Sequence, residues 1–295
     1  MNQLFKGAGV ALCTPFSDGT INEDALAELI EWHIAAGTDA LILAGTTGES
    51  ATLSHEEKLD LFKMGVKLAA GRIQIIAGTG SNNTAETIAL SKEAEAIGVD
   101  GLLLVVPAYN KPSQRGLLAH YRAIAQEVSL PIILYNVPGR TALDMKPETV
   151  IELSFVDNIV ALKEASGDVP RVRQILADSK PGFMVYAGND GEIFDVLELG
   201  GHGVISVLAN ICPAETKQLT VDYWSGDKAA AKAAQAHFVK LIDALFIETN
   251  PVPVKVAMNL MGLNAGPLRL PLVELAPENQ AALISVMTEY ELLED

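Results

Sequence analysis

Basic residues are scarce in this chain of 295 residues. It has 21 lysines and arginines against 37 aspartates and glutamates, which gives a formal net charge of −16. A nucleic-acid-binding protein needs a basic surface to neutralise phosphates, so this charge argues against a nucleic-acid partner. No apolar run approaches the length of a membrane-spanning helix, and residues 1–7 lack the pattern of a signal peptide. We therefore expect a cytoplasmic protein with no membrane partner.

Residues that bind metals or nucleotides are few or scattered. The two cysteines, Cys13 and Cys212, show no paired spacing, so we interpret them as reduced thiols. The five histidines show no metal-ligand spacing; they are His33, His55, His120, His202 and His237. The glycine-rich stretches match neither a Walker A loop nor a dinucleotide fingerprint, and no G-x-S-x-G sequence occurs. We predict no metal and no cofactor.

A regular series of short apolar runs, typical of buried parallel strands, is present instead. There are eight, at residues 8–14, 40–44, 73–78, 101–106, 131–136, 159–163, 183–187 and 203–207. Helical periodicity lies between them, for example after the capping-box pattern of Ser54 and Glu57. Strands that alternate with single helices pair in parallel, and eight such units predict a (β/α)₈ TIM barrel. A doubly wound open sheet is the alternative, which the count of eight disfavours.

The pattern changes after Pro213, where the strands stop. Four helical segments follow, at residues 214–223, 227–246, 254–261 and 278–292. Only the first is needed to close the barrel. We therefore predict a barrel at residues 1–224 that carries the active site, and a C-terminal extension of three helices at residues 225–295. The extension would pack on the barrel or in an oligomer contact.

Lys163 ends the sixth apolar run, where the strands of a barrel enzyme meet the loops that form its site. Burial disfavours the ammonium and leaves a neutral amine, which is a nucleophile for carbonyl groups. The alternative is a side chain that reaches solvent or pairs with Glu164, and this segment alone favours that alternative. Tyr135 is the fifth residue of the preceding run, as Lys163 is of its own, so its phenol would either relay protons to the amine or fill the barrel mouth.

Other strand ends supply polar groups. Thr46 and Thr47 lie in a glycine-flanked turn whose free N–H groups suit a carboxylate or phosphate, unless the turn is purely structural. The guanidinium of Arg140 could bind a carboxylate through two parallel hydrogen bonds, although many loop arginines are simply solvated. Tyr109 is a loop aromatic that we assign to an interface rather than to packing. Gly188 would let a ligand approach the backbone closely. Together these groups favour covalent imine catalysis on a keto acid.

Five stretches carry a resemblance to a known family. They are residues 45–49 (GTTGE), 135–138 (YNVP), 163–167 (KEASG), 201–206 (GHGVIS) and 250–255 (NPVPVK). In this order they resemble the dihydrodipicolinate synthase and N-acetylneuraminate lyase family of pyruvate-dependent class I aldolases, and the resemblance covers the whole chain.

The resemblance implies a role for each matching residue. Lys163 would form the Schiff base with pyruvate. Thr46 and Thr47 would bind the pyruvate carboxylate, Thr47 through its backbone N–H. Tyr135 would donate and accept protons, and Thr46 would link it to Tyr109, which would reach in from a neighbouring subunit. The family therefore implies a homotetramer, a dimer of dimers.

The second substrate follows from the same resemblance. Arg140 is typical of the synthase branch, where it would hold the carboxylate of L-aspartate-4-semialdehyde, and Gly188 and Ile205 would line the pocket. The implied reaction is the lyase-class condensation of pyruvate with this aldehyde, in lysine and diaminopimelate biosynthesis. The alternatives are an aldolase for N-acetylneuraminate or a 2-keto-3-deoxy sugar acid, and a keto-acid-binding barrel without turnover. Arg140 argues against the first, and the intact lysine and its tyrosine partner argue against the second.

Many synthases of this family bind the inhibitor lysine at a dimer interface. The matching positions here are Ser50, Ala51, His55, Lys58, Asn82, Glu86 and Ala108. Lys58 stands where inhibited enzymes often have a histidine, and Ala108 stands where they often have a tyrosine. A cation at Lys58 would repel the lysine ammonium, and Ala108 removes an aromatic wall that would favour it. We therefore predict weak or absent inhibition by lysine.

Overall fold

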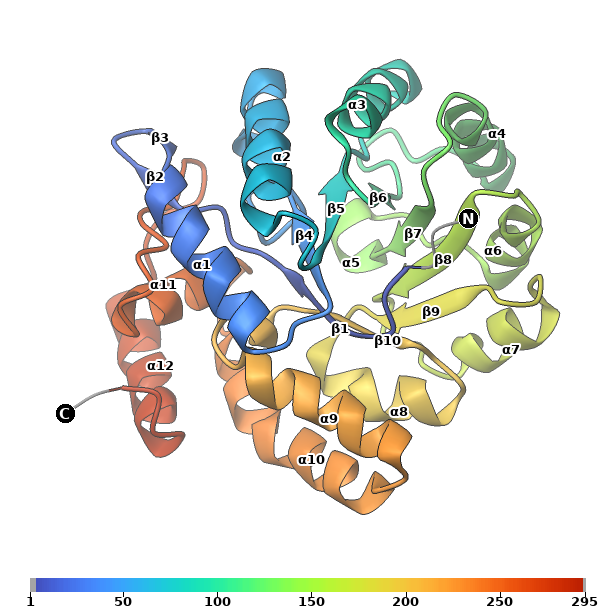
Figure 1. Cartoon of the computed structure of the whole chain (residues 1–295). Coiled ribbons are helices and arrows are strands. Elements are labelled where there is room, and N and C mark those ends of the chain that lie inside the picture. Colours follow the sequence, from blue (N-terminus) through green and yellow to red (C-terminus); the bar gives the residue numbers. More distant parts are fainter. Residues whose placement is uncertain (1–3, 294–295) are drawn as a thin grey trace.

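The computed structural model describes residues 4–293, and its centre is a closed barrel of eight parallel strands (Figure 1). The strands are β1 (Gly7–Ala11), β4 (Ala40–Leu43), β5 (Gln74–Gly78), β6 (Gly101–Val105), β7 (Ile132–Asn136), β8 (Ile159–Glu164), β9 (Met184–Ala187) and β10 (Gly203–Ser206). β1 pairs with both β4 and β10, which closes the sheet. The predicted barrel is confirmed, and the open-sheet alternative is excluded because neither β1 nor β10 is an edge.

A ring of helices surrounds the strands (Figure 1). The ring consists of α1 (Glu23–Ala35), α2 (His55–Ala69), α3 (Thr84–Ile97), α4 (Gln114–Ala125), α6 (Pro147–Ser154), α7 (Arg171–Asp178), α8 (Ile193–Glu198) and α9 (Pro213–Ser225). The predicted capping box begins α2, because the Ser54 hydroxyl accepts from Glu57 N–H and the Glu57 carboxylate accepts from Ser54 N–H. One helix after each strand gives the crossovers that parallel pairing requires.

Several short elements at the loops escaped prediction. They are the hairpin β2 (Phe16–Ser17) and β3 (Thr20–Ile21), the one-turn helix α5 (Pro138–Thr141), and the 3₁₀ turns η1 (Ser50–Thr52), η2 (Asp190–Glu192) and η3 (Leu208–Asn210). Elements of two to four residues are too short to show a hydrophobic period. All of them lie in the segments that follow the carboxyl end of a strand, so they shape the face where a site is expected.

Three helices follow the barrel, as predicted: α10 (Lys228–Ala244), α11 (Val252–Leu260) and α12 (Pro277–Glu289). In Figure 1 they extend from the α9 side of the barrel round to α1. Their apolar side chains belong to the same core cluster as the outer faces of the strands. The division into parts at residues 224 and 225 remains a prediction, and its outer limits, residues 1–3 and 294–295, lie outside the described residues.

The core has two layers because side chains alternate along each strand. One large cluster fills the space between strands and helices. A smaller cluster of 14 buried residues, among them Ile42, Leu103, Ile133 and Tyr135, fills the barrel interior. This inner cluster places Tyr135 among the side chains that point towards the barrel axis. Across residues 4–293, no helix has the length and apolar character needed to cross a membrane.

Candidate active site

Lys163 and Tyr135 are neighbours on adjacent strands. The register of β7 and β8 places Tyr135 directly opposite Lys163, as the equal spacing in the sequence predicted. The Lys163 Nζ atom lies 4.5 Å from the centroid of the Tyr135 ring. Lys163 is only 4% exposed, and Tyr135 is 6% exposed. The alternative in which Lys163 reaches solvent is therefore wrong.

Glu164 does not pair with Lys163 either, because successive side chains of a strand point to opposite faces. The Glu164 carboxylate accepts from the Asn136 side chain at 3.2 and 3.3 Å and from Ser166 N–H at 2.7 Å. It also faces Arg171, with 3.7 Å between the nearest nitrogen and oxygen. These bonds fix the carboxyl ends of β7 and β8 outside the barrel, and so support the lysine and tyrosine inside it.

The surroundings of Lys163 favour a neutral amine. Burial lowers its pKa from 10.5 to about 8; the buried Asp190 carboxylate opposes this shift, and the Arg140 guanidinium adds to it. Burial raises the pKa of Tyr135, while Arg140 and a hydrogen bond with the Thr46 side chain lower it. The site therefore joins a nucleophilic amine to a protonated phenol that touches a threonine hydroxyl.

The turn after β4 presents free backbone donors beside this pair. Within residues 4–293, the N–H groups of Thr46 and Thr47 donate to no other protein group. Two backbone hydrogen bonds span the turn and fix its shape: Glu49 N–H donates to Thr46 O at 3.1 Å, and Ser50 N–H donates to Gly45 O at 3.2 Å. Such a turn suits a carboxylate.

These groups line a small cavity of about 60 Å³ inside the barrel mouth, the inner cavity. Lys163, Tyr135, Thr46, Thr47, Arg140 and Gly188 all contribute to its wall. A side chain at position 188 would lie 2.6 Å from the Ala165 Cβ atom and 2.8 Å from Glu164 O. Glycine is therefore needed there for the close approach of the chain to β8, which the sequence argument had attributed to a ligand.

Two predicted site residues lie elsewhere. Ile205 is fully buried in the inner cluster with Tyr135, but it is not among the residues that line the described cavities. Tyr109 is 92% exposed on a loop, with a φ of 73° that is uncommon for a non-glycine residue. It does not line the inner cavity of its own chain. Its assignment to a neighbouring subunit's site stays a prediction.

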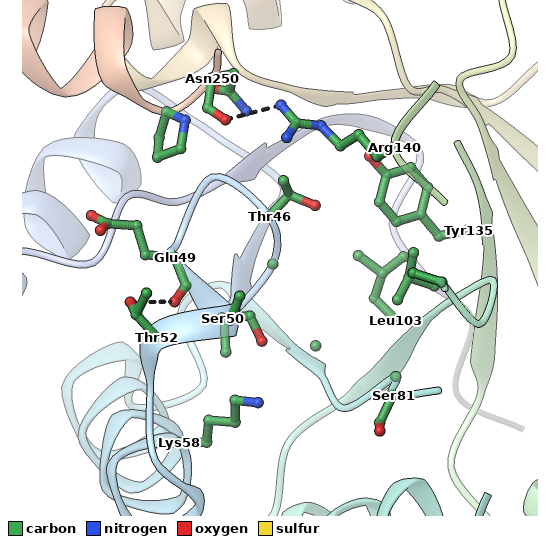
Figure 2. A pocket seen from close by; sticks show the side chains of 18 of the residues that line it. Thr46, Glu49, Ser50, Thr52, Lys58, Ser81, Leu103, Tyr135, Arg140 and Asn250 are labelled. Atoms are coloured by element: carbon green, nitrogen blue, oxygen red, sulfur yellow. Dashed lines mark hydrogen bonds between the residues drawn. The ribbon is translucent and has the colours of Figure 1, made fainter. Parts of the chain in front are cut away.

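The C-terminal segment supplies residues that the sequence argument missed. Phe246 and Asn250 line the inner cavity. The Asn250 side-chain N–H donates to the Thr47 hydroxyl at 3.0 Å. The backbone carbonyl of Asn250 accepts from Arg140 Nη2 at 2.9 Å (Figure 2). Asn250 thus joins the threonine turn to the arginine. The stretch at 250–255 is the signal that would have indicated this contact.

A larger outer cavity of about 670 Å³ adjoins the inner one through Thr46, Tyr135 and Arg140. Figure 2 shows Arg140 and Asn250 towards one side of this cavity and Lys58 and Ser81 towards the other. Five of the seven positions matched to the lysine site line it: Ser50, Ala51, Lys58, Asn82 and Ala108. His55 and Glu86 are not in its wall; His55 instead pairs with Glu93 at 2.7 Å.

Asp190 is a further buried acid that the sequence argument did not single out. Its Oδ2 atom accepts from the N–H groups of Val207 and Leu208, at 2.9 Å each. Burial raises its pKa, while hydrogen bonds from Ser206, Leu208 and Val207 and the charge of Lys163 lower it. In the part of the chain that the structure describes, no group of three or more histidine, cysteine or acidic side chains is arranged to hold a metal ion.

Fold and site together define an enzyme of the (β/α)₈ barrel class, with its cavity at the carboxyl ends of the strands. A sequence profile of the Dihydrodipicolinate synthetase family matches residues 4–290. A relative named 4-hydroxy-tetrahydrodipicolinate synthase, from Thermoanaerobacter sp. (strain X514), is 52% identical over 293 residues, which cover 99% of each sequence. The chain belongs to the dihydrodipicolinate synthetase family, which confirms the resemblance seen in the five motifs.

Solved structures of the same family match this chain over nearly its whole length. Dihydrodipicolinate synthase from Aquifex aeolicus matches with a TM-score of 0.96 and 44% identity, over 99% of this chain and 100% of that chain. The enzyme from Cyanidioschyzon merolae with lysine bound matches with a TM-score of 0.96 and 40% identity, over 99% and 100% of the two chains.

Proposed function

We propose that this chain is a lyase with 4-hydroxy-tetrahydrodipicolinate synthase activity, which condenses pyruvate with L-aspartate-4-semialdehyde. The observation that carries the proposal is the pairing of Lys163 with Tyr135 in one cavity wall with Thr46, Thr47 and Arg140. The names of the full-length relatives support the same reaction. Its place is the biosynthesis of diaminopimelate and lysine. Two buried free cysteines, Cys13 and Cys212, suit the reducing cytoplasm.

The first half of the reaction makes a nucleophile from pyruvate. The neutral Lys163 amine adds to the C2 carbonyl, and the carbinolamine loses water to give an imine. The Thr46 and Thr47 N–H groups and hydroxyls hold the carboxylate, and Tyr135 moves the protons that addition and dehydration require. The Tyr135 phenolate, which remains after it has protonated the departing water, then takes a C3 proton, and this gives the enamine.

The second half joins the two substrates. The enamine C3 attacks the aldehyde carbon, and the aldehyde oxygen takes a proton to become a hydroxyl group. The amine of the second substrate then adds to the imine carbon and displaces the Lys163 amine, which closes the ring and restores the enzyme. Arg140, at the cavity wall and fixed by Asn250 O, binds the carboxylate of the semialdehyde.

A panel of aldehydes with pyruvate tests this proposal. We expect turnover with L-aspartate-4-semialdehyde and none with N-acetylmannosamine or sugar-derived aldehydes. Arg140→Ala should lower kcat/KM for the semialdehyde by ten- to a hundredfold, about the effect of one charge-assisted hydrogen bond. Arg115→Ala, which removes an exposed arginine from α4, is the matched control and should leave turnover unchanged. Preferential cleavage of N-acetylneuraminate or a 2-keto-3-deoxy sugar acid would contradict the proposal.

A further inference from the structure

A buried ion pair lies beside the threonine turn, and the reaction described above does not use it. Lys255 of α11 is 1% exposed, and its Nζ atom lies 2.6 Å from Oε1 of Glu49. The same ammonium donates to Thr14 O at 2.9 Å and lies 4.2 Å from the centroid of the Phe16 ring. The other carboxylate oxygen of Glu49 accepts from Arg269 N–H at 3.0 Å. Both charges are therefore buried and fully engaged by protein groups.

Glu49 is also the residue that closes the turn. Its N–H donates to Thr46 O, and its backbone has a φ of 54°, in the left-handed region. A non-glycine residue stays in that region only where its surroundings hold it there. A second bond fixes the neighbouring peptide, because the Thr14 hydroxyl donates to Gly48 O at 2.7 Å. The Lys255 ammonium also binds Thr14 O. One ammonium therefore holds the threonine turn both through Glu49 and through Thr14.

Stability alone does not explain such a pair. The cost of removing two charges from water often exceeds their attraction, and apolar residues of similar volume are commonly as stable. The partners are 206 residues apart in the chain, and one of them adjoins Thr46 and Thr47. We propose that Glu49 and Lys255 are positioning residues that hold the Thr46–Thr47 turn in the geometry that binds the carboxylate of the keto acid. This inference rests on the proposed function, which makes pyruvate the ligand of that turn.

The double variant Glu49→Met/Lys255→Met tests the inference, because it removes both charges and keeps the volume. We expect KM for pyruvate to rise about tenfold or more, while kcat and KM for the semialdehyde change less than about threefold. A merely structural pair would lower the melting temperature and kcat without separating the two KM values. Should the double variant lose the barrel's circular dichroism, Glu49→Gln/Lys255→Met decides, because it also removes both charges while the glutamine oxygen can still accept from Arg269 N–H. This variant is expected to raise KM for pyruvate in the same selective way.

A second, half-buried ion pair provides the matched control. The Lys217 ammonium lies 2.7 Å from both carboxylate oxygens of Asp39, which comes just before β4, at the opposite end of the barrel. Asp39→Asn/Lys217→Met should change thermal stability without changing either KM. A folded Glu49→Met/Lys255→Met enzyme with an unchanged KM for pyruvate would overturn the inference.

Borohydride reduction separates this result from a failure of the proposed function. If the wild-type chain forms no pyruvate adduct on Lys163, the proposed function itself fails. If wild type and double variant both form the adduct, with half-saturation at the same pyruvate concentration, only the positioning role fails. The inference is supported when both chains form the adduct and the double variant needs about tenfold more pyruvate.

Discussion

Lys163 acts as a nucleophile because of where it is buried. Burial lowers its pKa more than any other influence does. The nearby Asp190 carboxylate raises this pKa, and the Arg140 guanidinium lowers it further. With a pKa of about 8, roughly a tenth of the lysine is neutral at pH 7, far more than for an exposed lysine. Tyr135, whose pKa is raised by burial, stays protonated over the same range and can donate its proton.

This pKa predicts the pH dependence of imine formation. Because the neutral amine reacts, kcat/KM for pyruvate should rise with pH below about 8 and level off above it. An exposed lysine would give a rate that still rises beyond pH 9. Asp190→Asn removes a charge that favours the ammonium, so the acidic limb should move to lower pH. Stopped-flow measurement of the rate of imine formation across pH checks the profile of the unmodified chain and its shift in Asp190→Asn. A profile with the same acidic limb in both chains would contradict the electrostatic argument.

At the scale of elements, the sequence was informative where patterns are local. The apolar runs located every barrel strand, and the equal spacing of Tyr135 and Lys163 along their runs matched the observed register. The contacts of Asn250 with Thr47 and of Lys255 with Glu49 span more than 200 residues. No periodicity encodes such contacts, because they depend on how α11 docks on the barrel.

The outer cavity lies between η1, α2 and the loop before α3, and it yields the prediction about lysine. Burial lowers the pKa of Lys58, and the Glu86 carboxylate raises it, so this acid already faces a cation. Glu86 also accepts from the side chains of Ser81 and Asn83. A lysine ligand would have to compete for that carboxylate.

We therefore expect little inhibition by sub-millimolar lysine in a steady-state assay. Lys58→His/Ala108→Tyr removes the competing cation and adds an aromatic wall, and should create inhibition. Lys63→His, which changes an exposed lysine of the same helix, is the control and should have no effect. Strong inhibition of the unmodified chain at these concentrations would refute the prediction.

At the scale of the whole molecule, Tyr109 suggests an assembly. Its ring is 92% exposed, yet its loop is held by bonds from the Asn82 side chain to Ala108 O and from the Asn110 side chain to Asn82 O. The fixed loop and its left-handed backbone therefore hold this ring out from the chain, where a partner can contact it. We propose that a second copy does so, within a tetramer built as a dimer of dimers.

Complementation between two inactive chains tests this assembly. Lys163→Ala lacks the nucleophile, and Tyr109→Phe lacks the relay hydroxyl. If Tyr109 serves the neighbour's site, co-expression of the two variants should restore about a quarter of the sites, because half of the randomly formed dimers are mixed and each has one complete site. Activity equal to the sum of the separate variants would show that Tyr109 acts within its own chain or not at all.

The central claim is that Lys163 bonds covalently to pyruvate, and one measurement tests it most directly. The chain is reduced with borohydride in the presence of pyruvate, digested, and examined by peptide mass analysis. The mass of a reduced pyruvyl group on Lys163, absent without pyruvate and absent from Lys163→Ala, is the predicted result. An adduct on a different lysine, or no adduct while the enzyme still turns over, would contradict it.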